Sequence, residues 1–401
     1  IDIEETSIKI GNLSNDSNGI YNKNIDTPYT TTCPNDDKHN IEIRKNSIVT
    51  LGNIGVSSKG IYLQNSGNII VSNNSIITCD DIYKSSHGIY CEGTVNPTVT
   101  NYGGSGNDND NDLLINGYGN IYISNTSEIN LNNIRDCSYG IYNHSNDHEG
   151  LSINFSSDSI SNQNNKLDIN GFGNFYLETD CNINIGDIQY SSYGIYNWGE
   201  IKKNNTKIQI SGSNTLNQVI MNGCGNIHIN DSNQIKIGNI SREINEECSG
   251  LANLSSYGIY NLATNKGTII IESDDHHIDN IKINGCGNYW LQSSDILIGE
   301  INNDSHGVSN IGTNIDGGKI ITSKSKFSNI DINGCGNFYN NKCNLTISNI
   351  SNCSYGISNR YSDTLSDIDS DNGSNLISID CNDNSIDTIT INGSGNLYNY
   401  Q

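Results

Sequence analysis

Strong helix formers and proline are nearly absent from this chain. It contains two alanines, Ala252 and Ala263, one methionine and three prolines. Because alanine and methionine favour helices, their scarcity argues against a helical fold. Hydrophobic residues make up only 34% of the chain, and no run approaches the roughly eighteen apolar residues of a membrane helix. The composition therefore excludes helical bundles and helical membrane spans.

Positive charge is scarce as well. The chain has 21 Lys and Arg against 44 Asp and Glu, a formal net charge of -23. Such a surface repels nucleic acids and anionic lipids, so neither is expected as a partner, whereas cations are attracted. No secretory signal is visible, and the numbering begins at Ile1, from which we expect a secreted protein whose leader has been removed.

What the sequence has in abundance is a repeated motif, Asn-Gly-x-Gly-Asn, which begins at Asn116, Asn170, Asn222, Asn284, Asn333 and Asn392. The copies follow each other at intervals of about fifty residues, a period typical of solenoids and blade arrays. Glycine adopts left-handed turn conformations without strain and asparagine does so at little cost, so the motif predicts a corner of the chain. The predicted corner glycines are Gly117, Gly119, Gly171, Gly173, Gly223, Gly225, Gly285, Gly287, Gly334, Gly336, Gly393 and Gly395.

A second motif, Tyr-Gly-Ile-Tyr-Asn, keeps step with the first, as at 139–143 and 193–197. Short alternating segments such as 182–188 lie between the two motifs, and an apolar residue at every second position predicts β-strands. We expect stacked asparagine side chains to hydrogen-bond to one another between successive turns of the chain.

These repeats predict an all-β, parallel β-helix over residues 1–401, which is a single elongated solenoid. If the stretch from one Asn-Gly-x-Gly-Asn motif to the next is called a unit, the units are irregular and have long loops in 1–112 and are regular in 113–401. A coil of three short strands takes roughly 20 to 30 residues, so we expect two coils per unit and about fifteen coils in all. The alternative is a β-propeller, which is disfavoured because the chain has only two tryptophans and short strands.

The repeats resemble those of right-handed parallel β-helix proteins of the pectate-lyase-like superfold. The Gly-Ile-Tyr-Asn element also resembles short repeats of bacterial surface adhesins and polymorphic outer-membrane proteins. This resemblance implies a fold and does not by itself imply an activity.

Twelve cysteines, an even number, suit a disulfide-bonded extracellular protein. Cys224, Cys286 and Cys335 occupy one corner position, and with two coils per unit they are expected about 9 to 10 Å apart, too far for a bridge. They are therefore predicted to be small buried hydrophobes. Bridges are expected within irregular segments, with Cys79–Cys91 and Cys343–Cys353 as candidates.

Two runs of alternating carboxylates are candidate calcium sites, since aspartates at every second position of a loop can converge on a hard cation. The alternative is a solvated acidic loop, and neither run completes an EF-hand. No other cofactor is expected. The candidate ligands are Asp108, Asp110 and Asp112, and Asp367, Asp369 and Asp371.

Asn-x-Ser/Thr sequons are abundant and are the acceptor signal for N-glycosylation, although this composition produces many by chance. The candidates are Asn12, Asn125, Asn143, Asn204, Asn253, Asn344 and Asn372.

Three functions remain open at this stage. Strand-like segments at both ends, without polar caps, favour a non-enzymatic structural subunit of an extracellular or cell-surface filament that assembles with itself head to tail. The second is an adhesin stalk fragment that binds glycans or a cell-surface anchor. The third, a polysaccharide lyase or hydrolase, is disfavoured because the four arginines, Arg44, Arg135, Arg242 and Arg360, fall in dissimilar contexts. No catalytic residue is assigned.

Overall fold

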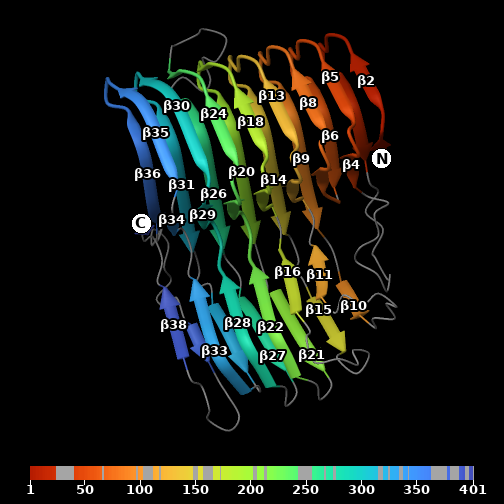
Figure 1. Ribbon diagram of the computed structural model, residues 1–401, viewed down its shortest axis with the longest axis vertical. Coiled ribbons are helices and arrows are strands. Elements are labelled where there is room, and N and C mark those ends of the chain that lie inside the picture. Colours follow the sequence, from red (N-terminus) through yellow and green to blue (C-terminus); the bar gives the residue numbers. More distant parts are fainter. Residues whose placement is uncertain are drawn as a thin grey trace, which may run out of the picture.

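The computed structural model describes residues 1–23, 40–65, 67–95, 98–102, 112–116, 119–147, 152–156, 166–171, 173–201, 206–211, 215–242, 255–265, 268–273, 277–314, 319–323, 326–333, 337–341, 343–362, 377–379, 388–392 and 397–400. Within these ranges the chain forms strands and no helix, so no described helix is long and apolar enough to cross a bilayer. The strands form five sheets, here named A to E, in which every described pairing is parallel (Figure 1). This confirms the predicted parallel β-helix.

Sheets A, B and C enclose the core. Sheet A contains β1 (Asp2–Glu4), β4 (Ile41–Arg44), β7 (Ile69–Val71), β12 (Ile121–Ile123), β17 (Phe175–Glu178), β23 (Ile227–Asn230), β29 (Tyr289–Gln292), β34 (Phe338–Asn341) and β39 (Leu397–Tyr400). Sheet B contains β2 (Ser7–Ile10), β5 (Ile48–Leu51), β8 (Ile76–Cys79), β13 (Glu128–Leu131), β18 (Asn182–Ile185), β19 (Ile188–Gln189), β24 (Gln234–Ile237), β25 (Ile240–Ser241), β30 (Asp295–Asn302) and β35 (Asn344–Ile350). Sheet C contains β3 (Asn18–Lys23), β6 (Lys59–Asn65), β9 (His87–Val95), β14 (Tyr139–Asp147), β20 (Tyr193–Ile201), β26 (Tyr257–Asn265), β31 (His306–Asn314) and β36 (Tyr355–Ser362).

Sheets D and E form a second block, drawn below the first in Figure 1. Sheet D contains β10 (Thr98–Tyr102), β15 (Ser152–Ser156), β21 (Thr206–Ser211), β27 (Thr268–Ser273), β32 (Lys319–Ser323) and β37 (Ile377–Ile379). Sheet E contains β11 (Asp112–Asn116), β16 (Lys166–Asn170), β22 (Thr215–Asn222), β28 (His277–Asn284), β33 (Lys326–Asn333) and β38 (Thr388–Asn392). From β7 onwards the chain visits A, B, C, D and E in turn, and one circuit around the stack is called a rung.

The pairing register corrects the predicted number of coils per unit. Ile121 pairs with Phe175, and Phe175 pairs with Ile227, so neighbouring strands are one whole unit apart. Each unit is therefore a single rung, and the expected two coils per unit, with the figure of about fifteen coils, is wrong. The physical reason is that the second half of each unit pairs only within sheets D and E and never returns to the core between A, B and C. The stack is accordingly short, and the longest dimension runs along the strands (Figure 1).

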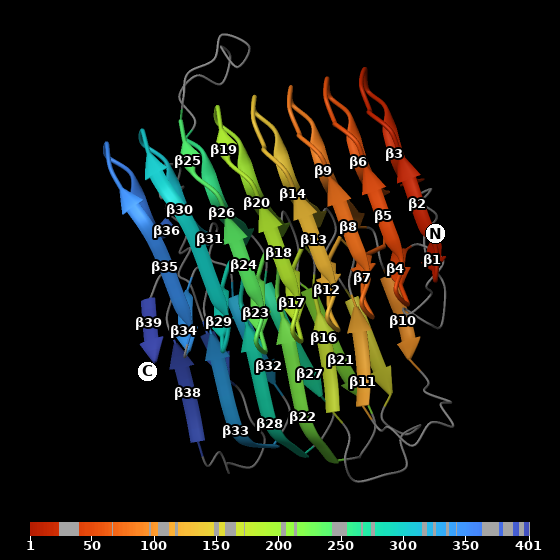
Figure 2. The ribbon, with the colours of Figure 1, turned by 45° about the horizontal axis from the view of Figure 1, so that its top comes forward.

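Early rungs are smaller than later ones. Ile41 pairs with Ile69, only 28 positions further on, because β6 in sheet C is followed directly by β7 in sheet A. Sheets D and E begin with β10 and β11, after the third strand of sheet C (Figure 2). Rungs that contain only sheets A, B and C are thus followed, from β7, by rungs that contain all five sheets. The division predicted between residues 112 and 113 stays a prediction.

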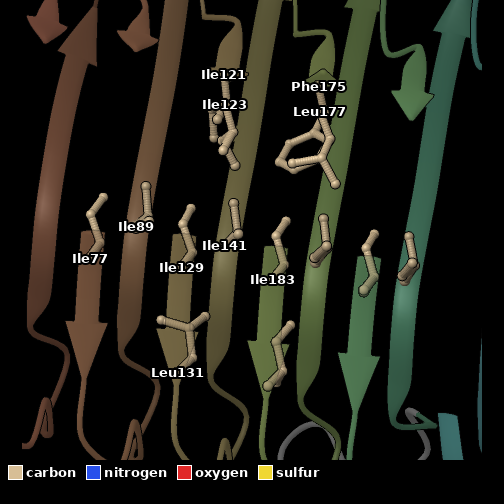
Figure 3. Packing of buried hydrophobic residues seen from close by; sticks show 14 of the residues in the cluster. Ile77, Ile89, Ile121, Ile123, Ile129, Leu131, Ile141, Phe175, Leu177 and Ile183 are labelled. Carbon is tan, nitrogen blue, oxygen red and sulfur yellow. The ribbon is translucent and has the colours of Figure 1, made fainter. Parts of the chain in front are cut away.

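The core lies between sheets A, B and C and is built almost entirely from β-branched and leucine side chains. Each rung contributes the same positions, for example Ile121 and Ile123 from sheet A, Ile129 and Leu131 from sheet B, and Ile141 from sheet C (Figure 3). These side chains are at most 4% exposed. Because strand side chains alternate between two faces, a few apolar residues per rung are enough to fill this interior.

The predicted corner is confirmed where it is described. The second glycine of the motif has a left-handed backbone, with φ of 69° at Gly119 and 63° at Gly225. The first glycine is needed for a different reason, since a Cβ atom added at Gly223 would lie 2.8 Å from the carbonyl oxygen of Gly285 in the next rung. One glycine therefore permits the turn and the other permits close stacking.

The predicted asparagine ladders are also present. In the corner ladder, the side-chain Oδ1 of Asn174 accepts from the backbone N–H of Asn226 at 2.8 Å, and the Oδ1 of Asn226 accepts from Asn288 at 2.9 Å. In sheet C, the Nδ2 of Asn143 donates to Asn197 Oδ1 at 2.8 Å, and Asn197 donates to Asn261 at 2.9 Å. These amides are fully buried, so each ladder satisfies polar groups that would otherwise be costly to bury.

Two further corners, between sheets A and B and between B and C, use pairs of left-handed residues that are not glycine. At the corner between B and C, Val56 and Ser57 have φ of 54° and 58°, and at the corner between A and B, Thr179 and Asp180 have φ of 59° and 57°. Stacking supports this strained backbone, because the corner N–H groups donate to carbonyls of the neighbouring rung, as Cys137 does to Tyr190 at 2.9 Å.

We predict that Gly223→Ala lowers the free energy of unfolding by about 1–3 kcal/mol, because the added methyl group must push two rungs apart. Gly11→Ala is the matched control, since a Cβ atom at Gly11 meets nothing within 4 Å. The measurement is equilibrium unfolding in urea. Equal stability of the two variants would contradict the assigned role of Gly223.

Candidate functional site

The candidate calcium ligands fall largely beyond what the structure describes. Asp108, Asp110, Asp367, Asp369 and Asp371 lie outside the described residues, and Asp112 is the first residue of β11. Among the described residues, no group of three or more His, Cys, Asp or Glu side chains is arranged to hold a metal ion. Calcium binding therefore stays a prediction.

The sequons differ in accessibility. Asn12 and Asn125 are exposed, and Asn344 lies on β35. Asn143 is wrong as a glycosylation candidate, because its side chain is fully buried and donates hydrogen bonds to the Asn174 carbonyl and to Asn197. The remaining candidates, Asn204, Asn253 and Asn372, lie outside the described residues.

The two predicted disulfides are not formed. Cys79 and Cys91 are free thiols that take the places of aliphatic residues in two different sheets, next to Leu51 and Leu63 respectively. Burial raises the pKa of the Cys79 thiol to about 12, which makes it unreactive.

Cys343 and Cys353 are also free. They are kept apart because Cys343 precedes β35, at the corner between sheets A and B, whereas Cys353 follows β35, at the corner between B and C.

At the glycine corner the structure brings two cysteines together. Cys224 and Cys286 are fully buried beside Ala263, as predicted, but they lie on adjacent rungs and their Sγ atoms are 2.8 Å apart. The expected separation of 9 to 10 Å was wrong, because it assumed an intervening coil. Cys335 lies outside the described residues.

Aromatic rings form two columns on sheet C. One column has ring centroids 4.9 to 5.1 Å apart and contains Tyr21, Tyr62, Tyr90, Tyr142, Tyr196 and Tyr260. The other has centroids 4.7 to 5.1 Å apart and contains His87, Tyr139, Tyr193, Tyr257, His306 and Tyr355. Neighbouring rings are stacked face to face, except for Tyr142 and Tyr196, whose planes are tilted by 56°. The columns therefore stabilise the stack and offer no open row of ring faces on which a sugar would stack.

A third aromatic column follows sheet A through Tyr122, Tyr176, His228, Trp290 and Tyr339. Side chains of sheet E lie beside it across the glycine corner: Tyr339 donates from its hydroxyl to Asn333 Oδ1 at 3.0 Å. Burial and, as a smaller cause, the positive charge of Lys282 together lower the pKa of His228 to about 3. Burial also raises the pKa of Asp331, and Lys282 opposes that change. This is the place in the described chain where His, Lys and Asp side chains influence one another.

This cluster could not be predicted from the repeats, because its members come from distant parts of the sequence. One signal exists in retrospect. Lys282 precedes Trp290 by eight positions, and Asp331 precedes Tyr339 by eight. With this spacing the first residue lies in sheet E and the second in sheet A, on either side of the glycine corner.

The described guanidinium groups are engaged in ion pairs, most of them between rungs. Arg44 contacts Asp2 of the neighbouring rung at 2.7 Å and Glu42 of its own strand at 3.0 Å, and Arg242 contacts Asp304 of the neighbouring rung at 2.9 Å. Arg135 lies 4.0 Å from Asp81. These arginines tie neighbouring strands together and do not gather around a common point.

The outermost described rungs expose residues that are buried elsewhere. Ile350 of β35 and Ile357 of β36 are 45% and 41% exposed, whereas Ile301 and Val308, their counterparts one rung earlier, are fully buried. At the opposite end, Tyr21 of β3 is 40% exposed. Comparison of the chain with protein-family models, curated proteins and solved structures gives no match.

We predict that His228→Tyr makes stability less sensitive to acid. The unfolded chain binds a proton at this histidine near pH 6.5 and the folded chain only near pH 3, so protons favour unfolding between these values and stability falls as the pH drops through this window. Removing the group should reduce that slope by up to about 1.4 kcal/mol per pH unit.

The measurement is urea unfolding at several pH values from 4 to 7. Tyr122→Phe, in the same column, is the control because tyrosine does not titrate in this range, and it should keep the wild-type slope. An unchanged slope in His228→Tyr would show that the folded chain protonates this histidine at its ordinary pKa.

Proposed function

We propose that the chain is a non-enzymatic structural subunit of an extracellular or cell-surface filament, assembled head to tail through the outermost rungs. The observation that carries the proposal is the exposure of Ile350 and Ile357 at positions that are fully buried one rung earlier. Covering them with another rung removes apolar surface from water, which is favourable by about 25 cal/mol per Å². The edge strands also offer unpaired backbone groups that a further parallel strand can satisfy.

The two ends of the stack present strands of the same three sheets. The first described rung consists of β1, β2 and β3 in sheets A, B and C, and the same three sheets end in β39, β35 and β36. The contact joins two different surfaces, so it is heterologous and extends without closing, as a filament requires.

One strand complicates the joint. Sheet A already ends in β39, one step beyond β35 and β36, and an incoming β1 belongs to sheet A as well. For β2 and β3 of one copy to pair directly with β35 and β36 of the next, either β1 or β39 must leave sheet A. We expect only one of these two strands to remain in sheet A at the contact between two copies.

The proposed extracellular location is supported by Cys137, which is disulfide-bonded. Disulfides persist mainly in oxidising compartments. We also propose that the chain is related to right-handed β-helices of the pectate-lyase-like superfold and to proteins with surface-adhesin repeats, which its motifs resemble. The adhesin stalk remains the second candidate, because further rungs of a longer protein would cover the same isoleucines.

We predict that the wild-type chain forms fibres whose length grows with concentration, and that Ile357→Asp and Tyr21→Asp each prevent growth by placing a charge on one of the two end surfaces. Mixed one to one, the two variants should form dimers, because each retains the surface that the other lacks. Sedimentation velocity and electron microscopy provide the measurement.

Asn132→Asp is the matched control, since it adds the same charge at an exposed position in the middle of the stack and should leave assembly unchanged. Wild-type monomers at all concentrations would overturn the proposal. Dimers formed by either variant alone would also overturn it, because they would show that two identical ends meet.

A further inference from the structure

The corner cysteines sit where two thiols can join. Cys224 follows β22 and Cys286 follows β28, and Asn222 pairs with Asn284 just before them. Successive rungs are about 4.8 Å apart, which lies within the Cα separation of roughly 4.4 to 6.8 Å found in disulfides. The register therefore meets the first geometric requirement for a bridge.

The local backbone aligns the two side chains. Gly225 and Gly287, the residues after the cysteines, have φ of 63° and 69°, so the two corners have the same shape. The Gly287 N–H donates to the Cys224 carbonyl at 3.0 Å, which fixes one corner on the other. Two identical corners stacked in this way point equivalent side chains in the same direction.

The sulfur atoms are already in contact. Cys224 Sγ lies 2.8 Å from Cys286 Sγ, about 0.8 Å longer than an S–S bond. The Cys224 backbone N–H also donates to Cys286 Sγ at 3.5 Å. Their described apolar neighbour, Ala263, is small, and all three residues are fully buried.

From this geometry we infer that Cys224 and Cys286 are a modification site, an oxidisable dithiol that closes to a disulfide between two consecutive rungs. With glutathione disulfide as oxidant, one protein thiolate attacks a glutathione sulfur and releases one glutathione thiolate. The second protein thiolate then attacks the mixed disulfide and releases another. Two protein thiols lose their protons and are oxidised, and one glutathione disulfide is reduced to two glutathiones. The inference does not depend on the proposed filament.

Burial determines when the bond forms. Thiol–disulfide exchange needs access to the sulfur, and both sulfurs are fully buried in the folded chain. The bond is therefore expected to form as the rungs close during folding, and afterwards to be protected from external reductants.

The test is refolding of the full chain from denaturant in a buffer of reduced and oxidised glutathione, followed by acid quenching, alkylation of free thiols under denaturing conditions and peptide mass spectrometry. We predict a reducible peptide pair joining Cys224 to Cys286. The Cys286→Ala variant should show one more free thiol than the wild type, although it contains one cysteine fewer, because Cys224 loses its partner.

A second measurement covers variants that fold poorly. The oxidised wild type should melt several degrees above the reduced wild type, since the bond closes a long loop, and Cys224→Ala should show a smaller difference, because only the Cys137 disulfide then distinguishes its two forms. Cys79→Ala is the control, because Cys79 is a buried free thiol elsewhere in the core, and it should keep the wild-type response. Full alkylation of both cysteines after oxidative refolding, or a link from Cys286 to Cys335, would overturn the assignment.

Discussion

Parallel stacking in register, at about 4.8 Å per rung, is the constraint from which the other features follow. Each residue lies on its counterpart in the next unit, so a residue type that stacks well on itself becomes a column. Asparagine does so because its amide both donates and accepts, as Asn143 and Asn197 show. Tyrosine does so through its ring faces, and isoleucine through its shape. Glycine at 171 and 223 is the converse case, since any side chain there meets the backbone of the next rung.

The sequence predicted the parts of the fold that depend on one position recurring in every unit. The left-handed glycines, the amide ladders and the alternating core strands were all visible as repeats, and the structure confirms them. The rung length could not be predicted in the same way. Strand segments such as 268–271 and 278–283 have the same composition as those of the core, and nothing local distinguishes strands that return to the core from strands that form a separate block. That single error also placed Cys224 and Cys286 too far apart.

Other features carry no local signal. Val56 and Tyr190 occupy left-handed positions that glycine or asparagine normally mark, and they are held there by hydrogen bonds between rungs. The environment of His228 depends on Lys282, which lies at the far end of the same unit, in a different sheet. Both depend on neighbours that are distant in sequence, so they become predictable only once the register is known. With one unit per rung established, the tyrosine columns follow directly from the positions of the repeated motif.

The change from small to large rungs shows that the circumference of this fold is adjustable. Between β6 and β7 the chain passes from sheet C to sheet A in three residues, whereas later rungs insert two strands at the same point without altering the register of sheets A, B and C. The passage from sheet C to sheet A is thus a position at which residues can be inserted without changing the core. It is the natural position at which to graft a foreign domain onto this scaffold, with the grafted copies displayed along one side.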